Sequence, residues 1–197
     1  MKLISFEGIE GVGKSTQIKL LKEYLESNKY TVKTFREPGS SRVGEEIRNI
    51  LLNNEFILTD TTELLLLFAA RTELVNQLKT DEYDYVLLDR YYDASLAYQG
   101  YGRGISLDLI NSLINSTKCP IPTHTILLDI DVITAFERKK NDTKDRIESA
   151  GSEFFEKVRD GYIKIANQNS QRFHIIDAKQ DIKTISDTVK NIILNNV

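Results

Sequence analysis

The sequence predicts an α/β fold, a five-stranded parallel sheet with helices on both faces. Short apolar runs rich in β-branched and aromatic residues recur along the chain, and a longer stretch with helical spacing follows each of them. The 197 residues contain only 3 prolines and 10 glycines, with no internal repeat and no low-complexity tract. Because strands that alternate with helices form a parallel sheet, we expect a single domain over residues 1–197.

The elements can be assigned in chain order. The expected strands are Lys2–Glu7, Tyr30–Phe35, Tyr83–Asp89, Thr123–Ile130 and Arg172–Asp177. The expected helices are Lys14–Ser27, Val43–Asn53, Thr62–Lys79, Ser106–Ser116, Val132–Lys140, Ser152–Gln168 and Asp181–Leu194. Between Lys139 and Gly151 the apolar pattern lapses and charged residues crowd together, which predicts a small mobile lid over about residues 139–151.

Composition and charge exclude several classes of protein. The 26 Lys and Arg residues against 29 Asp and Glu give a net charge of -3, whereas a domain dedicated to duplex binding is usually basic, so we expect no long nucleic-acid partner. The single cysteine, Cys119, cannot form an internal disulfide, and this favours a cytoplasmic location. Only Met1 and Lys2 precede the apolar residues of the first strand, and the longest apolar run, Leu64–Ala70, is too short to cross a bilayer. We therefore expect neither a targeting segment nor a membrane partner.

The strongest functional signal lies between the first strand and the first helix, at Gly8-Ile9-Glu10-Gly11-Val12-Gly13-Lys14-Ser15. The run matches the phosphate-binding pattern G-x-x-x-x-G-K-[ST] in its required strand-to-helix context and predicts a P-loop NTPase fold. Glycines let the loop wrap a phosphate closely, and backbone N–H groups at the helix start point at the anion. We expect ATP to be bound by Gly8, Ile9, Glu10, Gly11, Val12, Gly13, Lys14, Ser15 and Thr16.

Two oxygen-bearing side chains are candidate Mg²⁺ ligands. Ser15 ends the phosphate-binding pattern, and Asp89 stands at the carboxyl end of an expected strand, where ligands of open α/β sheets gather. An alternative for Asp89 is a cap on the next helix. A guanine-reading motif is absent, because in Thr143-Lys144-Asp145-Arg146 the aspartate comes one place too early. A GTP-dependent switch is therefore not expected.

Five blocks, the phosphate loop among them, carry a family resemblance. They are Phe6 through Thr16, Arg36-Glu37-Pro38-Gly39, Phe68-Ala69-Ala70-Arg71, Asp89-Arg90-Tyr91 with Ser95-Leu96-Ala97-Tyr98-Gln99-Gly100, and Asp145-Arg146-Ile147-Glu148. In order and spacing they resemble the bacterial thymidylate kinase family, and the resemblance covers essentially the whole chain. It implies transfer of the γ-phosphoryl group of ATP-Mg²⁺ to dTMP, giving dTDP for dTTP synthesis, and a homodimer.

An acceptor nucleotide brings a dianionic phosphate, which forked arginines can grip; Arg36, Arg71 and Arg90 are the candidates. The resemblance implies that Arg71 and Gln99 also read the thymine edge. It further implies that Glu10 and Glu37 form an acidic pair near the sugar and the acceptor phosphate. The full expected dTMP-binding set is Glu10, Arg36, Glu37, Pro38, Arg48, Phe68, Arg71, Arg90, Ser95, Tyr98 and Gln99.

The chain departs from the family pattern at two places. The family commonly has a thymine-stacking Phe four residues before the arginine, where this chain has Leu67; we expect Phe68, three residues before, to supply the ring face, with Leu67 as the alternative. Some members carry an arginine in the phosphate loop, where this chain has Gly11. The missing transition-state cation is therefore expected from the lid, from Arg146 first and otherwise from Arg138, Lys139, Lys140 or Lys144.

The expected catalytic residues are thus Lys14, Arg90 and Arg146. Two alternatives stay open, a kinase of another nucleoside monophosphate or of a deoxynucleoside, and a P-loop ATPase that works as an interaction switch. His124, His174 and Cys119 are interpreted as structural, since no ligand partner stands at metal-binding spacing.

Overall fold

A five-stranded parallel sheet forms the centre of the molecule in the computed structural model, which describes residues 1–78, 82–140 and 145–194. Its strand order is β2-β3-β1-β4-β5, and all four pairings are parallel. The strands are β1 (Lys2–Glu7), β2 (Val32–Arg36), β3 (Tyr85–Asp89), β4 (His124–Asp129) and β5 (Phe173–Asp177). The predicted fold class is confirmed.

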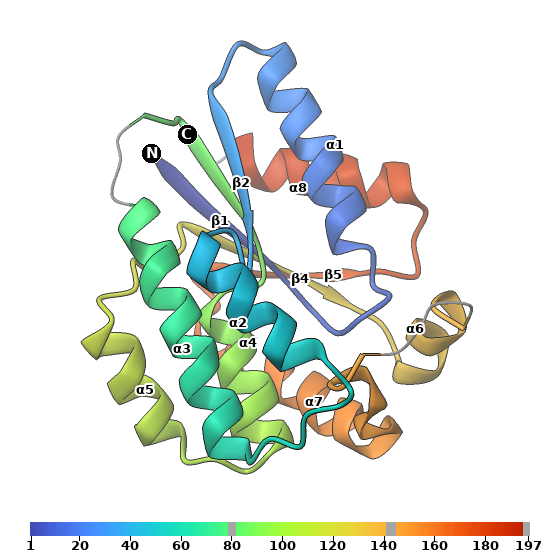
Figure 1. Ribbon diagram of the computed structural model, residues 1–197. Coiled ribbons are helices and arrows are strands. Elements are labelled where there is room, and N and C mark those ends of the chain that lie inside the picture. The colour runs from blue at the N-terminus through green and yellow to red at the C-terminus, as the bar shows by residue number, and fades with distance from the viewer. Residues whose placement is uncertain (79–81, 141–144, 195–197) are drawn as a thin grey trace.

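Helices cover both faces of this sheet (Figure 1). They are α1 (Lys14–Ser27), α2 (Arg42–Leu52), α3 (Asp60–Gln77), α4 (Tyr92–Ser95), α5 (Leu107–Ser116), α6 (Val132–Arg138), α7 (Ser152–Gln168) and α8 (Ile182–Leu194), with a π-helix η1 (Leu96–Gly102) and a 3₁₀ turn η2 (Glu148–Ala150). In Figure 1, α1 and α8 lie together on one side of the sheet, and α3, α5 and α7 lie on the other. The result is a three-layer α/β/α arrangement.

The alternation of β1 explains this layering. Ile4 and Phe6 belong to the same buried cluster as Leu21 of α1, whereas Leu3 packs with Leu74 of α3. Strand β1 lies in the middle of the sheet and has a layer of helices on each face, so both sets of its side chains are buried, including the polar Ser5 and Glu7. The sheet therefore holds the carboxyl ends of β1 and β3 rigidly at one edge, where the phosphate loop begins.

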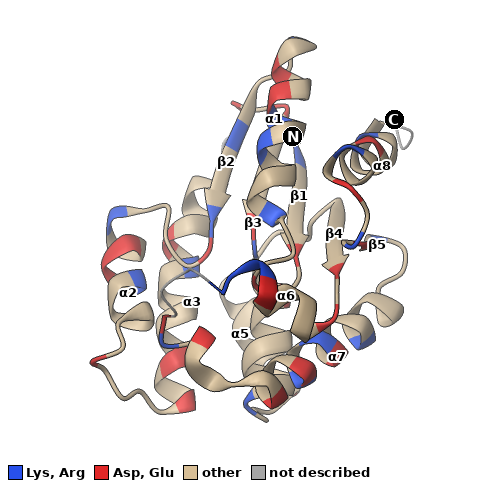
Figure 2. Cartoon of the chain, turned by 90° about the vertical axis from the view of Figure 1, so that its right-hand side faces the viewer, with Lys and Arg blue, Asp and Glu red and all other residues tan. Residues whose placement is uncertain are grey.

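Positive and negative side chains are distributed unevenly (Figure 2). Lysine and arginine appear where α1 begins and where α6 ends, and acidic segments are spread over the outer helices. The net charge of -3 is thus a sum over regions of opposite sign.

The predicted elements are found either with the same bounds or with boundary shifts of one or two residues, and one helical segment was missed. The predicted end of the third helix, Lys79, lies outside the described residues. Residues 92–102 form α4 and η1, where no helix was predicted, because two glycines and several tyrosines hide the helical spacing. No described helix is both long and apolar enough to span a membrane.

The two histidines pair with each other on neighbouring strands. Their ring nitrogens, Nδ1 of His124 and Nε2 of His174, are 3.0 Å apart. Both residues lie near the starts of their strands, at the edge of the sheet opposite the phosphate loop. Burial lowers the pKa of each imidazole. The pair is therefore far from the candidate site.

Candidate active site

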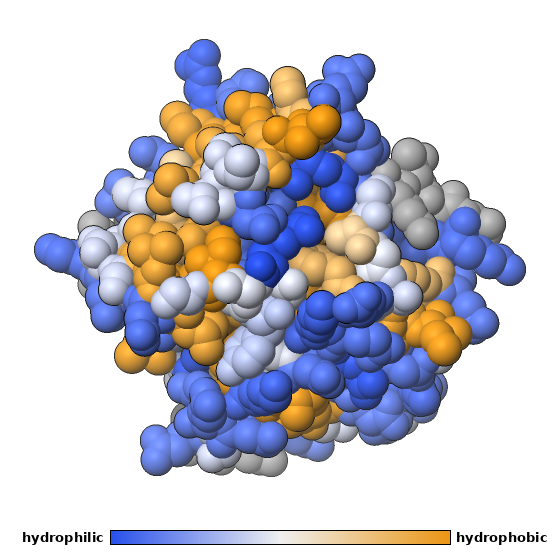
Figure 3. Space-filling view, turned by 90° about the horizontal axis from the view of Figure 1, so that it is seen from below, coloured by the Kyte–Doolittle hydropathy of each residue, from blue (hydrophilic) through white to orange (hydrophobic). Residues whose placement is uncertain are grey.

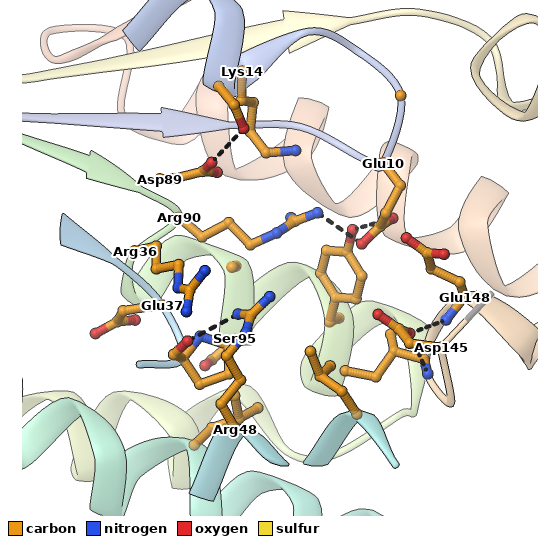
Figure 4. Close-up of a pocket in the computed structure, with 18 of the residues that line it drawn as sticks. Glu10, Lys14, Arg36, Glu37, Arg48, Asp89, Arg90, Ser95, Asp145 and Glu148 are labelled. Atoms are coloured by element: carbon orange, nitrogen blue, oxygen red, sulfur yellow. Dashed lines mark hydrogen bonds and ion pairs between the residues drawn. The ribbon is translucent and has the colours of Figure 1, made fainter. Parts of the chain in front are cut away.

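A cavity of about 470 Å³ opens at the carboxyl edge of the sheet. Such a position is typical of ligand sites in open α/β folds. Figure 4 shows its walls: Lys14 and Asp89 lie on one side of Arg90, and Glu37, Ser95 and Arg48 lie on the other. The predicted residues that line it are Glu10, Gly11, Gly13, Lys14, Ser15, Thr16, Arg36, Glu37, Pro38, Arg48, Arg71, Asp89, Arg90, Ser95, Tyr98 and Gln99.

Glycines allow the phosphate loop to pack against its neighbours. Gly8 and Gly11 both have positive φ angles, 129° and 79°. A Cβ atom on Gly8 would overlap the carbonyl oxygen of Leu128, and one on Gly11 would overlap that of Ala135. The absence of an arginine at position 11 thus has a steric cause, because α6 occupies the space that its side chain would need.

Lys14 stands at the end of the phosphate loop, and its side chain folds back into that loop. Its Nζ donates hydrogen bonds to the carbonyl oxygens of Gly8 at 3.0 Å and Ile9 at 2.9 Å. Burial, with a smaller contribution from Arg90, lowers the pKa of Lys14 to about 8. A polyphosphate beside this ammonium group would favour its charged form, so Lys14 is suited to bind phosphate.

Ser15 and Asp89 meet across the start of α1 and the end of β3. The Ser15 hydroxyl donates to Oδ2 of Asp89 at 2.9 Å. A hydroxyl and a carboxylate oxygen at one point are the donor types that Mg²⁺ takes when substrate phosphates complete its coordination. The described parts of the chain contain no cluster of three or more His, Cys, Asp or Glu side chains for a metal. The residues present therefore fit a Mg²⁺ that arrives with a nucleotide.

Arg90 occupies the middle of the site. Its backbone φ of 67° is a left-handed conformation that is strained for a side chain with a Cβ. Its guanidinium donates to the Gly8 carbonyl at 2.9 Å and to Glu10 Oε1 at 2.8 Å, and it lies 4.8 Å from the ring centre of Tyr98. Glu10 also accepts a hydrogen bond from the Tyr98 hydroxyl at 2.8 Å. These contacts orient Arg90 between the phosphate loop and the far wall of the cavity, where Glu37, Ser95 and Arg48 lie.

Arg71 and Glu37 form a buried ion pair on the far wall. Arg71 Nε and Nη2 lie 2.8 and 2.7 Å from Glu37 Oε2, and Nη1 donates to Ser95 Oγ at 3.0 Å. Burial raises the pKa of Glu37, and the charge of Arg71 acts against this effect. The pair holds the Arg71 guanidinium in a fixed plane beside the cavity, which suits the recognition of a planar or anionic ligand.

Arg36 and Arg48 approach the cavity from β2 and α2. Arg36 pairs with Glu45 at 2.8 Å, and Arg48 donates to the Pro38 carbonyl at 2.9 Å. Arg36 is exposed and Arg48 is half-buried. With Arg71 and Arg90, they are four of the five arginines that line the cavity, and these four come from four different segments, in agreement with the acceptor-phosphate hypothesis.

The structure differs from the expected position of Phe68. Leu67 lines the cavity, whereas Phe68 is only 3% exposed and packs in a cluster with Leu64 and Ile110. The centre of the Phe68 ring lies 4.5 Å from the Arg71 guanidinium carbon, so the ring packs against the arginine. The reason is helical geometry, since one residue along α3 turns a side chain by about 100°. Leu67, and not Phe68, is therefore the apolar side chain that this part of α3 contributes to the cavity wall.

Arg146 also differs from its expected position. Its Nη2 lies 2.6 Å from Glu63 Oε2 and its Nε donates to the Leu51 carbonyl at 2.8 Å, so it does not line the cavity. Two of the alternative lid cations, Arg138 and Lys139, do line it. Lys139 pairs with Glu148, and Arg138 donates to the Ala178 carbonyl at 2.9 Å. Of the other two alternatives, Lys140 does not line the cavity and Lys144 lies outside the described residues.

Several lining residues were not predicted to bind a ligand. They are Leu52, Ala94, Asp145, Ile147 and Glu148. Asp145, Ile147 and Glu148 belong to a block that the sequence analysis had singled out, which was a usable signal. Leu52 and Ala94 had none, because an apolar residue at a helix end is usually part of a core. Gly8, Ile9 and Val12 lie in the phosphate loop but do not line the cavity.

Comparison with known proteins decides the family. A family model for thymidylate kinase matches residues 6–189. The chain belongs to the thymidylate kinase family. A curated thymidylate kinase of Kosmotoga olearia is 42% identical over 191 residues, 94% of this chain and 92% of the relative, and one of Vesicomyosocius okutanii is 43% identical over 98% of this chain and 97% of the relative. The crystal structure of a thymidylate kinase from Ehrlichia chaffeensis matches with a TM-score of 0.79 and 34% identity, covering 98% of this chain and 97% of that one.

The resemblance found in the sequence is thus confirmed, and this thymidylate kinase family member is a nucleotide kinase with a P-loop fold. The family supplies the class of reaction. The geometry described above supplies the candidate role of each side chain.

Proposed function

We propose that this family member transfers the γ-phosphoryl group of ATP to dTMP, forming dTDP and ADP, in the cavity at the carboxyl edge of the sheet. One observation carries the proposal. The phosphate-loop residue Lys14 and the candidate acceptor residues Arg71 and Gln99 line the same cavity. A donor and an acceptor nucleotide can therefore meet there without water between the reacting groups.

The donor triphosphate binds to the loop at residues 8–16. Backbone N–H groups and the start of α1 face the phosphates, and the Lys14 ammonium group neutralises their charge. Ser15 and Asp89 would hold Mg²⁺ beside the phosphates. The ion would neutralise part of the charge on the phosphate oxygens.

The acceptor nucleotide lies against the opposite wall. Arg36, Arg71 and Arg90 grip the dTMP phosphate, Arg48 lies along the same pocket, and Leu67 packs on the thymine face. Arg71 and Gln99 contact the thymine edge. The remaining acceptor contacts come from Glu10, Glu37, Pro38, Ser95 and Tyr98.

No general base is required for this transfer. The acceptor phosphate is already an anion at neutral pH, so catalysis consists of in-line positioning and stabilisation of charge on the transferring oxygens. Arg90 lies between the two walls and contacts the loop carbonyl of Gly8. Arg138 and Lys139 supply the lid cations, and lid closure over residues 139–151 excludes water.

A coupled assay of ADP release with each nucleoside monophosphate tests the function. We expect dTMP to stimulate turnover most, and replacement of Arg71 by Ala to remove most of that stimulation at low dTMP. Lys157→Ala is the matched control, because Lys157 is an exposed cation of α7 outside the cavity. Preference for another monophosphate would indicate a different acceptor. ATP turnover that needs a macromolecular partner instead of dTMP would indicate an interaction switch.

We also propose a homodimer. Leu65 of α3 and Leu109 of α5 are 54% and 46% exposed on the same side of the sheet, although both are large and apolar. Figure 3 shows apolar side chains gathered between polar ones on the face seen from below. Sedimentation analysis should give twice the 22.5 kDa chain mass, and Leu65→Glu should shift it towards the monomer. A monomeric wild type would contradict the proposal.

We further propose that residues 1–197 fold as one unit in the cytoplasm. The sheet supports the first part, because β1 from the start of the chain pairs with β4, which pairs with β5 near its end. Urea unfolding should therefore show a single transition by fluorescence and circular dichroism. The lone Cys119 supports a reducing compartment, which fractionation of the source cells would test.

A further inference from the structure

Glu63 is a buried carboxylate that the proposed mechanism does not use. It lies in the first turn of α3, is 1% exposed and does not line the cavity. Three side chains from distant segments converge on it, Gln99 of η1, Arg103 just after η1 and Arg146 of the lid. Glu63 thus connects Arg146 of the lid with Gln99 of the candidate acceptor site, so its role goes beyond filling space in the core.

The two arginines keep Glu63 ionised. Arg146 Nη2 lies 2.6 Å and Arg103 Nη2 lies 3.3 Å from Glu63 Oε2. Burial acts to raise the pKa of Glu63, but the hydrogen bonds and these charges outweigh it, so the pKa is lowered. An ionised carboxylate has no proton to give and can only accept hydrogen bonds.

Because the ionised Glu63 can only accept hydrogen bonds, it sets the orientation of the Gln99 amide. The Gln99 amide contacts Glu63 Oε1 at 2.9 Å, and only the Nε2 end of that amide can donate to a carboxylate. The carbonyl oxygen, Oε1, is therefore the end left for a ligand. Within the described residues no group donates a hydrogen bond to it, and Gln99 lines the cavity.

We infer that Glu63 is a positioning residue for base selection: its carboxylate holds the Gln99 amide so that an acceptor oxygen faces the nucleobase. The inference rests on the proposed binding of dTMP in this cavity. Thymine carries a donor, N3–H, on the edge that pairs with other bases, and uracil carries the same donor. Cytosine has an acceptor nitrogen at that position. The fixed Gln99 therefore favours dTMP and dUMP and rejects dCMP.

Replacing Glu63 with Gln should reverse this orientation. Both arginine Nη2 groups donate to Oε2, at 2.6 and 3.3 Å, whereas the arginine contact of Oε1 is longer, 3.5 Å from Arg103 Nε, so a new amide would place its oxygen at the Oε2 position. Its NH₂ group would then lie at the Oε1 position and face Gln99. To avoid two opposed donors, Gln99 would turn its oxygen towards residue 63 and its NH₂ group towards the base.

The experiment compares kcat/KM for dTMP, dUMP and dCMP in the wild type and Glu63→Gln. We expect the preference for dTMP over dCMP to fall by at least about tenfold, because one hydrogen bond changes from matched to opposed. The preference for dTMP over dUMP should stay as in the wild type, since both bases present N3–H. General loosening of the pocket would change both ratios together, so the pair of ratios separates positioning from a structural effect.

Asp93→Asn is the matched control. Asp93 is also a fully buried carboxylate, paired with both Nη atoms of Arg172 at 2.7 and 2.8 Å, but it does not line the cavity. We expect it to lower stability and to leave the ratio of dTMP to dCMP unchanged. An unchanged ratio in Glu63→Gln, or an equal change in Asp93→Asn, overturns the inference.

A second measurement covers the case in which Glu63→Gln does not fold. In the wild type, NMR should show the Nε2 protons of Gln99 protected from exchange both with and without dTMP, because they stay on Glu63. Loss of that protection on dTMP binding overturns the inference. Absence of dTMP-dependent ADP release by the wild type would instead overturn the proposed function, so the two failures are distinct.

Discussion

Gly11 and Gly13 offer a comparison that isolates one steric contact. Both belong to the phosphate loop and both have positive φ angles, 79° and 96°. A methyl group on Gly11 would overlap the backbone oxygen of Ala135 in α6, whereas one on Gly13 would meet nothing within 4 Å. Alanine at either position therefore carries backbone strain, but only Gly11→Ala forces α6 or the loop to move.

The size of the difference follows from these two contributions. Left-handed backbone with a Cβ costs roughly 1–2 kcal/mol, and this applies to both variants. Overpacking against a fixed neighbour adds about 1–3 kcal/mol, and this applies to Gly11→Ala alone. Since a domain of this size loses roughly 2–4 °C in Tm per kcal/mol, Gly11→Ala should melt several degrees below Gly13→Ala.

Thermal and urea unfolding of the wild type and the two variants, without nucleotide, would measure this difference. Without nucleotide, no variant can differ through a lost phosphate contact. Equal destabilisation of the two variants would refute the argument, because it would mean that the loop relaxes away from Ala135 at no cost.

Three further predictions follow from buried charges. Lys14 has a pKa of about 8, which a bound triphosphate should raise. ATP binding at pH 8.5 should therefore take up protons, and calorimetry in buffers of different ionisation enthalpy would measure the uptake. Binding without proton uptake would contradict the prediction. Burial and Asp93 raise the pKa of Glu7 to about 8, so the native state binds one more proton than the unfolded state between pH 4.5 and 8. The free energy of unfolding should therefore fall as the pH rises through this range, and it should fall less steeply in Glu7→Gln. Glu37→Gln should lower the free energy of unfolding by about 3–5 kcal/mol in urea, because it leaves Arg71 buried without its partner; a loss below about 1 kcal/mol would count against a buried pair.

The phosphate loop could be predicted from the sequence because its chemistry is local. Gly8, Gly13, Lys14 and Ser15 act within one strand-to-helix turn, and the spacing that places them is itself the motif. The sheet was predictable for a similar reason, since apolar strands and helical stretches alternate along the whole chain. Family resemblance then supplied the acceptor residues, and nearly all of them line the cavity.

The side on which a helical residue points could not be predicted from spacing alone. Phe68 and Leu67 are neighbours in α3, and only the packing of Phe68 with Ile110 decides that Leu67 faces the cavity. Arg146 is a similar case. Its place depends on Leu51 and Glu63, which are 95 and 83 positions away in the sequence.

The sequence by itself thus determined the parallel α/β sheet, the phosphate loop and the family, because each is written in contiguous residues or in their regular spacing. Only the tertiary structure decided which lid cations reach the cavity, which side chain of α3 adds an apolar contact to its wall and which carboxylate accepts a hydrogen bond from Gln99. Those features arise where segments distant in sequence pack together, and burial there determines the charge and the orientation of each group.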